Sequence, residues 1–159
     1  MDAFVQPLYE LADFDAIIRQ LKKPGIVQVS GCLDSQKAHF TNGLLREFPF
    51  RLIVAENDLK AKTFYEDFRL YDPEVLYYPA RDLIFYQADI HGNLLTRQRI
   101  QVLRALLERE EVTIVTSIDS CLDCLVPLAV WKEKVIKIRN DSEIDLDRMK
   151  RHLLELGYE

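Results

Sequence analysis

Short apolar, β-branched runs alternate with helix-length segments along most of this 159-residue chain. Four runs have the composition of strands: Ile26–Ser30, Arg51–Ala55, Val75–Pro79 and Val112–Thr116. Arg51–Ala55 shows little polar alternation, as expected for a strand buried on both faces. Because helix-length crossovers separate the four runs, the strands they predict lie parallel in one sheet with helices on both faces. The pattern therefore predicts an α/β domain of three layers.

Helix signals fall between these runs. Asp13 can cap a helix that Pro24-Gly25 stops, and Asn57 or Asp58 can cap another. An irregular stretch at 80–93 precedes the helix that leads into the fourth strand. The apolar stripes of the four predicted helices are Ala16, Ile17 and Leu21; Ala38, Thr41, Leu45 and Phe48; Ala61, Phe64, Tyr65 and Phe68; and Leu95, Ile100, Leu103 and Leu107.

The organisation changes after the fourth strand. A short helix is expected to end at Pro127, and Lys134–Arg139 alternates apolar and charged residues like a half-exposed strand of a smaller sheet. A last helix opens at Ile144 and Asp145, and Gly157 is placed to end it. We therefore expect a first domain over residues 1–126 and the start of a second, smaller α+β domain over 127–159, which the sequence leaves incomplete.

Composition limits the function classes. The chain is 48% hydrophobic and 30% charged, so it can form a core. Its net charge of -5 disfavours nucleic-acid binding by this chain alone, since phosphate contacts need clustered Lys and Arg. No apolar run approaches the roughly 20 residues of a membrane span, and the N-terminus has no secretion-signal pattern. Three cysteines do not make a disulfide framework, so we expect a reduced, cytoplasmic protein without a membrane partner.

The segment Gly31 to Ala38 partly matches the phosphate-binding loop G-x-x-x-x-G-K-[ST]. Gly31 and Lys37 are retained, but Gln36 replaces the second glycine and Ala38 replaces the hydroxyl residue that holds Mg²⁺. Asp34 adds a negative charge where phosphate would bind. The other three predicted strands also lack the acidic residue that hydrolysis requires. We therefore expect a vestigial loop with no functional cofactor site, or an ordinary strand-to-helix turn capped by Asp34 or Ser35.

Other candidate residues give weaker patterns. Cys121-x-x-Cys124 has no second ligand pair, so structural burial is favoured over a zinc or redox site. His91 has no partner at motif spacing and is expected on a loop surface. Tyr77 and Tyr78, with Phe85 and Tyr86 downstream, are expected to pack in the core. These patterns predict no catalytic residue and no metal ligand.

From Tyr71 to Cys124 the chain resembles the first domain of the excinuclease B subunit of bacterial nucleotide excision repair. It is still more similar to the matching N-terminal module of the bacterial transcription-repair coupling factor. The likeness lies in an acidic-Pro segment before the third strand, Pro79-x-x-Asp82 after it, and the helix from Arg97 that ends in "LLEREEVTIVTS". The segment "KVIKIRNDSEIDLDRMKRHLLELGYE" resembles the start of the coupling factor's second domain.

Two departures distinguish these relatives. The excinuclease subunit has an intact phosphate loop at the position of Gly31–Ala38, and it inserts an aromatic-rich hairpin for gripping damaged DNA. In this chain the loop is degenerate, and Tyr77-Tyr78 runs directly into Pro79-Ala80-Arg81-Asp82. In both respects this chain is similar to the coupling factor. The resemblance thus implies a P-loop-NTPase-like fold with a degenerate phosphate loop.

The resemblance also implies a function. Coupling factors of this type are bacterial cytoplasmic proteins that release RNA polymerase stalled at DNA lesions and bring in repair enzymes. Their ATP- and Mg²⁺-dependent DNA translocase lies far downstream, and the N-terminal module recruits the excinuclease A subunit and restrains that motor. The recruiting residues are expected beyond Glu159. Two alternatives stay open: a nucleotide-binding fragment of an excinuclease-B-like helicase, and an unrelated doubly wound domain.

Overall fold

The computed structural model describes all residues except 1, 82–88, 137, 139–142 and 156–159. Its contacts divide the chain into two units, Met1–Asp123 and Cys124–Glu159. The predicted domain boundary after residue 126 stays a prediction. The first unit contains α1 (Asp2–Val5), η1 (Gln6–Glu10), α2 (Phe14–Leu21), α3 (Asp34–Leu45), β1 (Phe50–Ala55), α4 (Asp58–Phe68), β2 (Leu76–Tyr78), α5 (Asp89–Glu108), β3 (Val112–Ser117) and α6 (Ile118–Cys121). The second contains α7 (Leu128–Lys134) and α8 (Leu146–Glu155).

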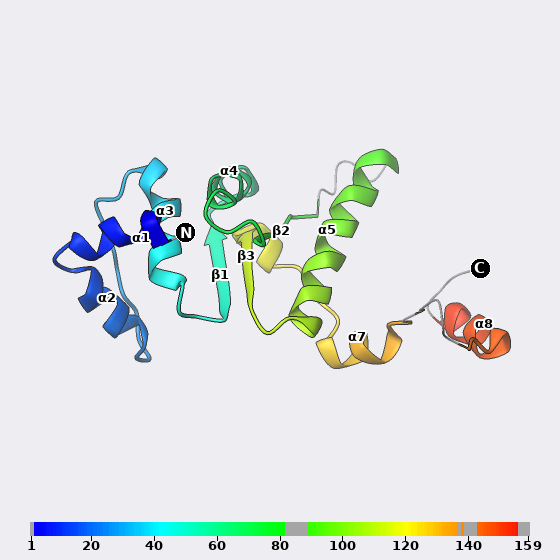
Figure 1. Ribbon diagram of the computed structural model, residues 1–159. Helices are drawn as coiled ribbons and strands as arrows, with labels where there is room; N and C mark the ends of the chain where they lie inside the picture. The colour runs from blue at the N-terminus through cyan, green and yellow to red at the C-terminus, as the bar shows by residue number, and fades with distance from the viewer. Residues whose placement is uncertain (1, 82–88, 137, 139–142, 156–159) are drawn as a thin grey trace. The chain divides into compact units, whose positions relative to one another are not determined.

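The first unit is built on a small open sheet of three strands in the order β1-β3-β2. Both pairs are parallel, and Ile114 of β3 lies opposite Leu52 of β1 and Leu76 of β2. The central strand β3 is buried along its whole length, whereas the exposure of β1 alternates from residue to residue. The predicted α/β class with a parallel sheet is confirmed (Figure 1).

Helices cover the two faces of this sheet. On one face Ala61 and Phe68 of α4 pack with Val115 of β3 and Tyr77 of β2, in a cluster that also contains Ala38 of α3. On the other face Val102 and Ala105 of α5 pack on Leu76, Tyr78, Val112 and Ile114. A third cluster joins η1 and α2 to α3 through Leu8, Phe14, Ile18, Phe40 and Leu44.

The predicted strand at Ile26–Ser30 is wrong, since these residues have no regular structure. Ile26 is 99% exposed, and Val29 is also exposed. A β-branched run becomes a strand only where a neighbour pairs with its backbone groups. Among the described residues β1, β3 and β2 pair with one another and leave this segment without a partner strand.

Three further expectations need correction or qualification. Of the stretch at 80–93 expected to be irregular, Asp89–Asn93 is helical because α5 begins at Asp89, and 82–88 lie outside the described residues. In the strand expected at Lys134–Arg139, Lys134 ends α7, positions 135, 136 and 138 have no regular structure, and 137 and 139 lie outside the described residues. The last helix does follow Asp145, whose Oδ1 accepts hydrogen bonds from the N–H groups of Asp147 and Arg148, while Gly157 lies outside the described residues.

Candidate functional site

The predicted phosphate loop, Gly31 to Ala38, includes the last residues before α3 and the first residues of that helix. Residues 26–33 have no regular structure, and Gly31 has a φ of 88°, which favours glycine over any residue with a Cβ atom. A Cβ added at Gly31 would meet no atom within 4 Å. The glycine is therefore required by the backbone conformation and not by a close approach of neighbouring atoms.

Gln36 uses its side chain to close the start of α3. The N–H of Leu33 donates to Gln36 Oε1 at 3.3 Å, while the N–H groups of Gln36 and Lys37 donate to the Leu33 carbonyl. Leu33 is the N-cap, so the prediction that Asp34 or Ser35 caps this helix is wrong. The physical reason is that the Gln36 amide reaches back from the first turn and satisfies a free N–H group there. In a phosphate loop such groups point at the ligand.

Lys37 is paired with a residue of its own helix turn. Its Nζ lies 2.6 Å from Asp34 Oδ1, and both side chains are exposed to solvent. This hydrogen-bonded ion pair lowers the pKa of the Asp34 carboxyl and raises the pKa of the Lys37 ammonium. The charge that would balance a phosphate is therefore already balanced within the loop.

Ala38 faces the protein interior. It is 2% exposed and belongs to the cluster formed by α4 and the sheet, with Ala61 and Phe68 among its members. A serine or threonine at this position would bring its hydroxyl into apolar surroundings. The position that supplies the magnesium ligand in a working loop thus serves as packing surface in this chain.

Asp58 joins the carboxyl ends of β2 and β3, and it is at the carboxyl ends of strands that α/β proteins commonly bind ligands. Its Oδ1 accepts hydrogen bonds from the Ala80 N–H at 3.1 Å and from Ser117 Oγ at 3.4 Å. Its backbone carbonyl accepts from the Tyr77 hydroxyl at 3.3 Å. Asp58 therefore connects the start of α4 with the segments that follow β2 and β3. The sequence pattern indicates a role for Asp58 only as a helix cap, and the N-cap of α4 is Asn57.

A cleft of about 490 Å³ lies beside the loop, with Gly31, Cys32 and Gln36 in its wall. Most of the other lining side chains are apolar, and they come from η1, α2, α3 and the segments that connect these helices. Its ionisable side chains other than Cys32 are Asp13 and His39, and His39 Nε2 is hydrogen-bonded to the Phe4 carbonyl. No Lys or Arg lines the cleft among the described residues, so these offer little to attract a triphosphate.

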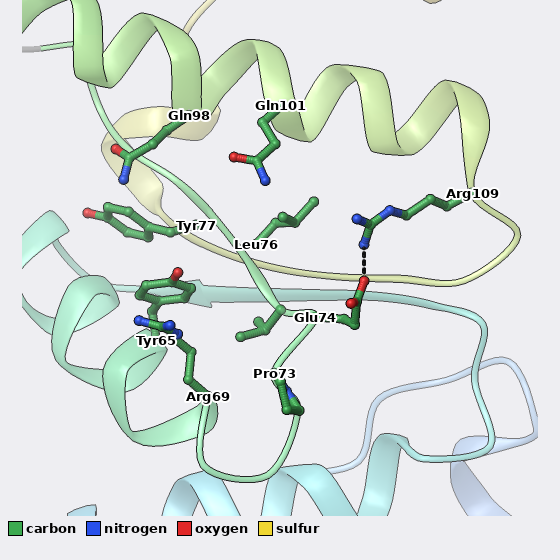
Figure 2. Close-up of a pocket in the computed structure, with 10 residues that line it drawn as sticks. Tyr65, Arg69, Pro73, Glu74, Leu76, Tyr77, Gln98, Gln101 and Arg109 are labelled. Atoms are coloured by element: carbon green, nitrogen blue, oxygen red, sulfur yellow. Dashed lines mark hydrogen bonds and ion pairs between the residues drawn. The ribbon is translucent and has the colours of Figure 1, made fainter.

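Figure 2 shows a second cleft, of about 220 Å³, at the side of β2 that does not pair with β3. Tyr65 and Arg69 of α4 form one wall, and Gln98 and Gln101 of α5 form the other. The ion pair between Arg109 Nη1 and Glu74 Oε2, 2.9 Å long, lies at its edge. The sequence patterns gave no sign of this cleft beyond the aromatic residues around Tyr77.

The remaining candidates do not come together in one site. Cys121 and Cys124 are free and exposed, so the predicted burial of this pair is wrong: Cys121 ends α6 on the solvent side. His91 lies within α5 and not on a loop. Tyr77 and Tyr78 are buried as predicted, whereas Phe85 and Tyr86 lie outside the described residues. In the described part of the chain no cluster of His, Cys, Asp or Glu could hold a metal ion, and no helix could cross a membrane.

No family model matches the chain. Its sequence is similar to the transcription-repair-coupling factor of Bacillus subtilis (strain 168), with 28% identity over 164 residues that cover 100% of this chain and 14% of the relative. It is 29% identical to UvrABC system protein B of Treponema denticola over 143 residues, 90% of this chain and 20% of the relative. With UvrABC system protein B of Thermosipho africanus it shares 31% identity over 69% of the chain and 16% of the relative.

These relatives are homologues of the chain over most of its length, and the predicted resemblance to both types of repair protein is confirmed. The chain spans a fifth or less of the length of each of the three relatives.

Proposed function

We propose that these residues form a non-catalytic module of a bacterial, cytoplasmic transcription-coupled DNA repair factor. In the longer protein, the module helps to recruit the excinuclease A subunit and restrains an ATP-dependent DNA translocase encoded downstream. That protein would release RNA polymerase stalled at lesions. The homology to transcription-repair-coupling factor and to UvrABC system protein B supports a role in nucleotide excision repair or transcription-coupled repair.

The non-catalytic part of the proposal rests on one observation. The three positions that would complete a working loop are engaged elsewhere: Lys37 with Asp34, Gln36 with the Leu33 N–H, and Ala38 in the core. Binding a triphosphate would require breaking the ion pair and the cap together. ATP and Mg²⁺ therefore belong to the downstream motor and not to this module.

The main alternative is a nucleotide-binding fragment of an excinuclease-B-like helicase, because relatives of that name match the chain about as well. A titration with fluorescent ATP and Mg²⁺ separates the two. We expect no saturable binding below about 1 mM. Sub-millimolar affinity that Lys37→Ala abolishes and Lys60→Ala preserves would establish the alternative. Lys60 is the matched control because it is another exposed lysine in a local ion pair, with Glu56.

The recruiting role is tested separately. Purified excinuclease A is expected to bind this chain weakly or not at all, since the recruiting residues are expected beyond Glu159. A version extended through the next strands should bind measurably in the same pull-down. Equal binding by the short chain would place the recruiting surface within these residues, and no binding by either would contradict the recruiting role.

A further inference from the structure

Among the residues that the structure describes, no strand pairs with the outer edge of β2, and this edge borders the cleft of Figure 2. The sheet order β1-β3-β2 makes β2 an edge strand, and it has only three residues. Edge strands carry backbone groups that another extended chain can pair with. The two helices stand on opposite sides of this edge, with Tyr65 of α4 and Gln98 of α5 facing the gap from either side (Figure 2).

Hydrogen bonds around β2 indicate which backbone groups face the cleft. The Tyr78 carbonyl accepts a hydrogen bond from Thr116 Oγ1 of β3 at 2.9 Å, so it points toward β3. Neighbouring residues of a strand direct their backbone groups to opposite sides. The N–H and C=O of Tyr77 therefore point to the open edge. The Pro79 carbonyl points the same way, but it already accepts a hydrogen bond from Arg99 Nη1 of α5 at 2.8 Å. Among the described residues, no neighbouring strand pairs with the backbone N–H and C=O of Tyr77, so a bound peptide could pair with them.

Side chains around the cleft add unused hydrogen-bonding groups. In the described part of the chain, the amides of Gln98 and Gln101 form no hydrogen bond. Arg69 lies with its guanidinium carbon 5.6 Å from the centre of the Tyr65 ring, and it has no carboxylate partner among the described residues. Tyr65 in turn stacks on Tyr77, with ring centres 5.4 Å apart. Through these contacts the guanidinium of Arg69 lies beside the open edge of β2.

We propose that this cleft binds an extended peptide segment of a partner protein, which adds to β2 as a short strand and places a carboxylate side chain on Arg69. Tyr77 pairs with the backbone of the segment, and Gln98 and Gln101 bond to its remaining N–H and C=O groups. This is strand addition, in which backbone pairing gives affinity and a side-chain contact gives specificity. The proposal is independent of the proposed function, because it uses neither the phosphate loop nor the second unit.

Single-stranded nucleic acid is the competing occupant, since bases stack on tyrosine and phosphates bind arginine. Three features favour the peptide. The Tyr65 ring is already stacked on Tyr77, Arg109 is paired with Glu74, and the chain carries a net charge of -5. Of the described residues that line the cleft, only Arg69 is left to neutralise a phosphate, whereas the unbonded amides and the strand edge fit a peptide backbone.

Amide NMR and fluorescence anisotropy on the full 159-residue chain test the proposal. The probe is an acetylated, amidated octapeptide of alternating valine and threonine with a central aspartate. We expect saturable shifts of the Tyr77 backbone amide and of the Gln98 and Gln101 side-chain amides. Because the contact with Arg69 is solvent-exposed, Arg69→Met should weaken binding about three- to fivefold, and so should a peptide with lysine in place of aspartate.

Arg104→Met is the matched control, because Arg104 is exposed on α5 in an ion pair with Glu108 and does not line the cleft. Circular dichroism should show both variants folded. A peptide N-methylated beside the aspartate should lose binding, because it cannot pair with Tyr77. The proposal is overturned if the Tyr77 amide does not shift at millimolar peptide, or if neither Arg69→Met nor the lysine peptide weakens binding. It is also overturned if an oligothymidylate shifts these resonances at lower concentration than the peptide.

Discussion

Lys37 Nζ lies 2.6 Å from Asp34 Oδ1, so the lysine at the position of a phosphate-loop lysine is neutralised by a carboxylate three residues before it. In a working loop the same lysine reaches the outer phosphates of a bound nucleotide. In this chain the Asp34 carboxylate takes the place that a nucleotide phosphate would have beside the lysine. It also keeps the lysine charged, since the ion pair raises its pKa.

Asp34→Asn should release Lys37 without creating a nucleotide site. We expect the pKa of the Lys37 ammonium to fall to its ordinary value, measured by NMR titration of labelled lysine. The lowered pKa of Asp34 stabilises the fold only above the ordinary aspartate range, and that contribution is lost as the pH falls through the native pKa. Because both side chains are exposed, the melting temperature should scarcely change. Saturable ATP binding by Asp34→Asn would show that Asp34 alone had closed the loop.

Ala38→Ser returns the hydroxyl of a working loop at the expense of the core. Ala38 is 2% exposed among apolar side chains, and burial of an unpaired hydroxyl costs about 1–3 kcal/mol. We expect the free energy of unfolding in urea to fall by that amount. Ser35→Ala, an exposed change of the reverse kind in the same helix, should shift it by less than about 0.5 kcal/mol. Equal stability of Ala38→Ser and the wild type would mean that the hydroxyl finds a partner.

The sequence predicts a degenerate phosphate loop, because Gln36 and Ala38 stand where a working loop has a glycine and a hydroxyl residue, and this interpretation stays a prediction. The sequence did not predict how those residues are used instead. The bond from the Leu33 N–H to Gln36 requires the side chain to turn back on the helix, and the burial of Ala38 depends on α4 packing above it. Both are consequences of tertiary packing that local pattern does not encode.

The same limit explains the first predicted strand. Ile26–Ser30 has the β-branched composition of a strand, as does Val112–Thr116, yet only the second is paired. Composition describes a preference for extended backbone, whereas a strand also needs a neighbour. The helix of Ala61 and Phe68 was predicted well because its stripe and its Asn57 cap are local signals. The role of Asp58 was missed because its partners, Ala80 and Ser117, are distant in sequence.

Tyr77 and Tyr78 should ionise late in an alkaline titration of the folded protein. Burial raises the pKa of Tyr77 and of Tyr78, and contact with Asp58 raises that of Tyr77 further. The folded protein thus holds these protons more tightly than the unfolded chain, whose tyrosines ionise near pH 10. The stability they contribute is complete below about pH 10 and is lost as the pH rises through their native pKa values. Absorbance at alkaline pH should show two late ionisations, one of which disappears in Tyr77→Phe and one in Tyr78→Phe.

Arg99→Met should destabilise the first unit strongly. Arg99 is 7% exposed; its Nη2 pairs with Asp123 Oδ2 at 2.8 Å, and its guanidinium carbon lies 4.2 Å from the centre of the Tyr78 ring. Removing one member of a buried ion pair costs about 3–5 kcal/mol, and the low end applies because Asp123 also lies 3.6 Å from Arg81 Nε. We expect a loss of about 3 kcal/mol by urea unfolding. The exposed Arg104→Met should cost less than about 1 kcal/mol, and equal losses in the two variants would contradict the assigned burial.

Substitution by lysine at two neighbouring positions of β1 should change the free energy of unfolding by very different amounts. Phe50, Leu52 and Val54 are 58%, 62% and 46% exposed on the face of the sheet where α5 packs on β2 and β3, whereas Ile53 packs on the opposite face against the cluster of α4. An exposed apolar edge strand promotes association. Leu52→Lys should therefore reduce self-association in light scattering and change the free energy of unfolding by less than about 0.5 kcal/mol. Ile53→Lys should lower that free energy by about 2 kcal/mol or more, because it introduces a charge into the packed face. If Leu52→Lys is as destabilising as Ile53→Lys, the face carrying Leu52 is buried in solution.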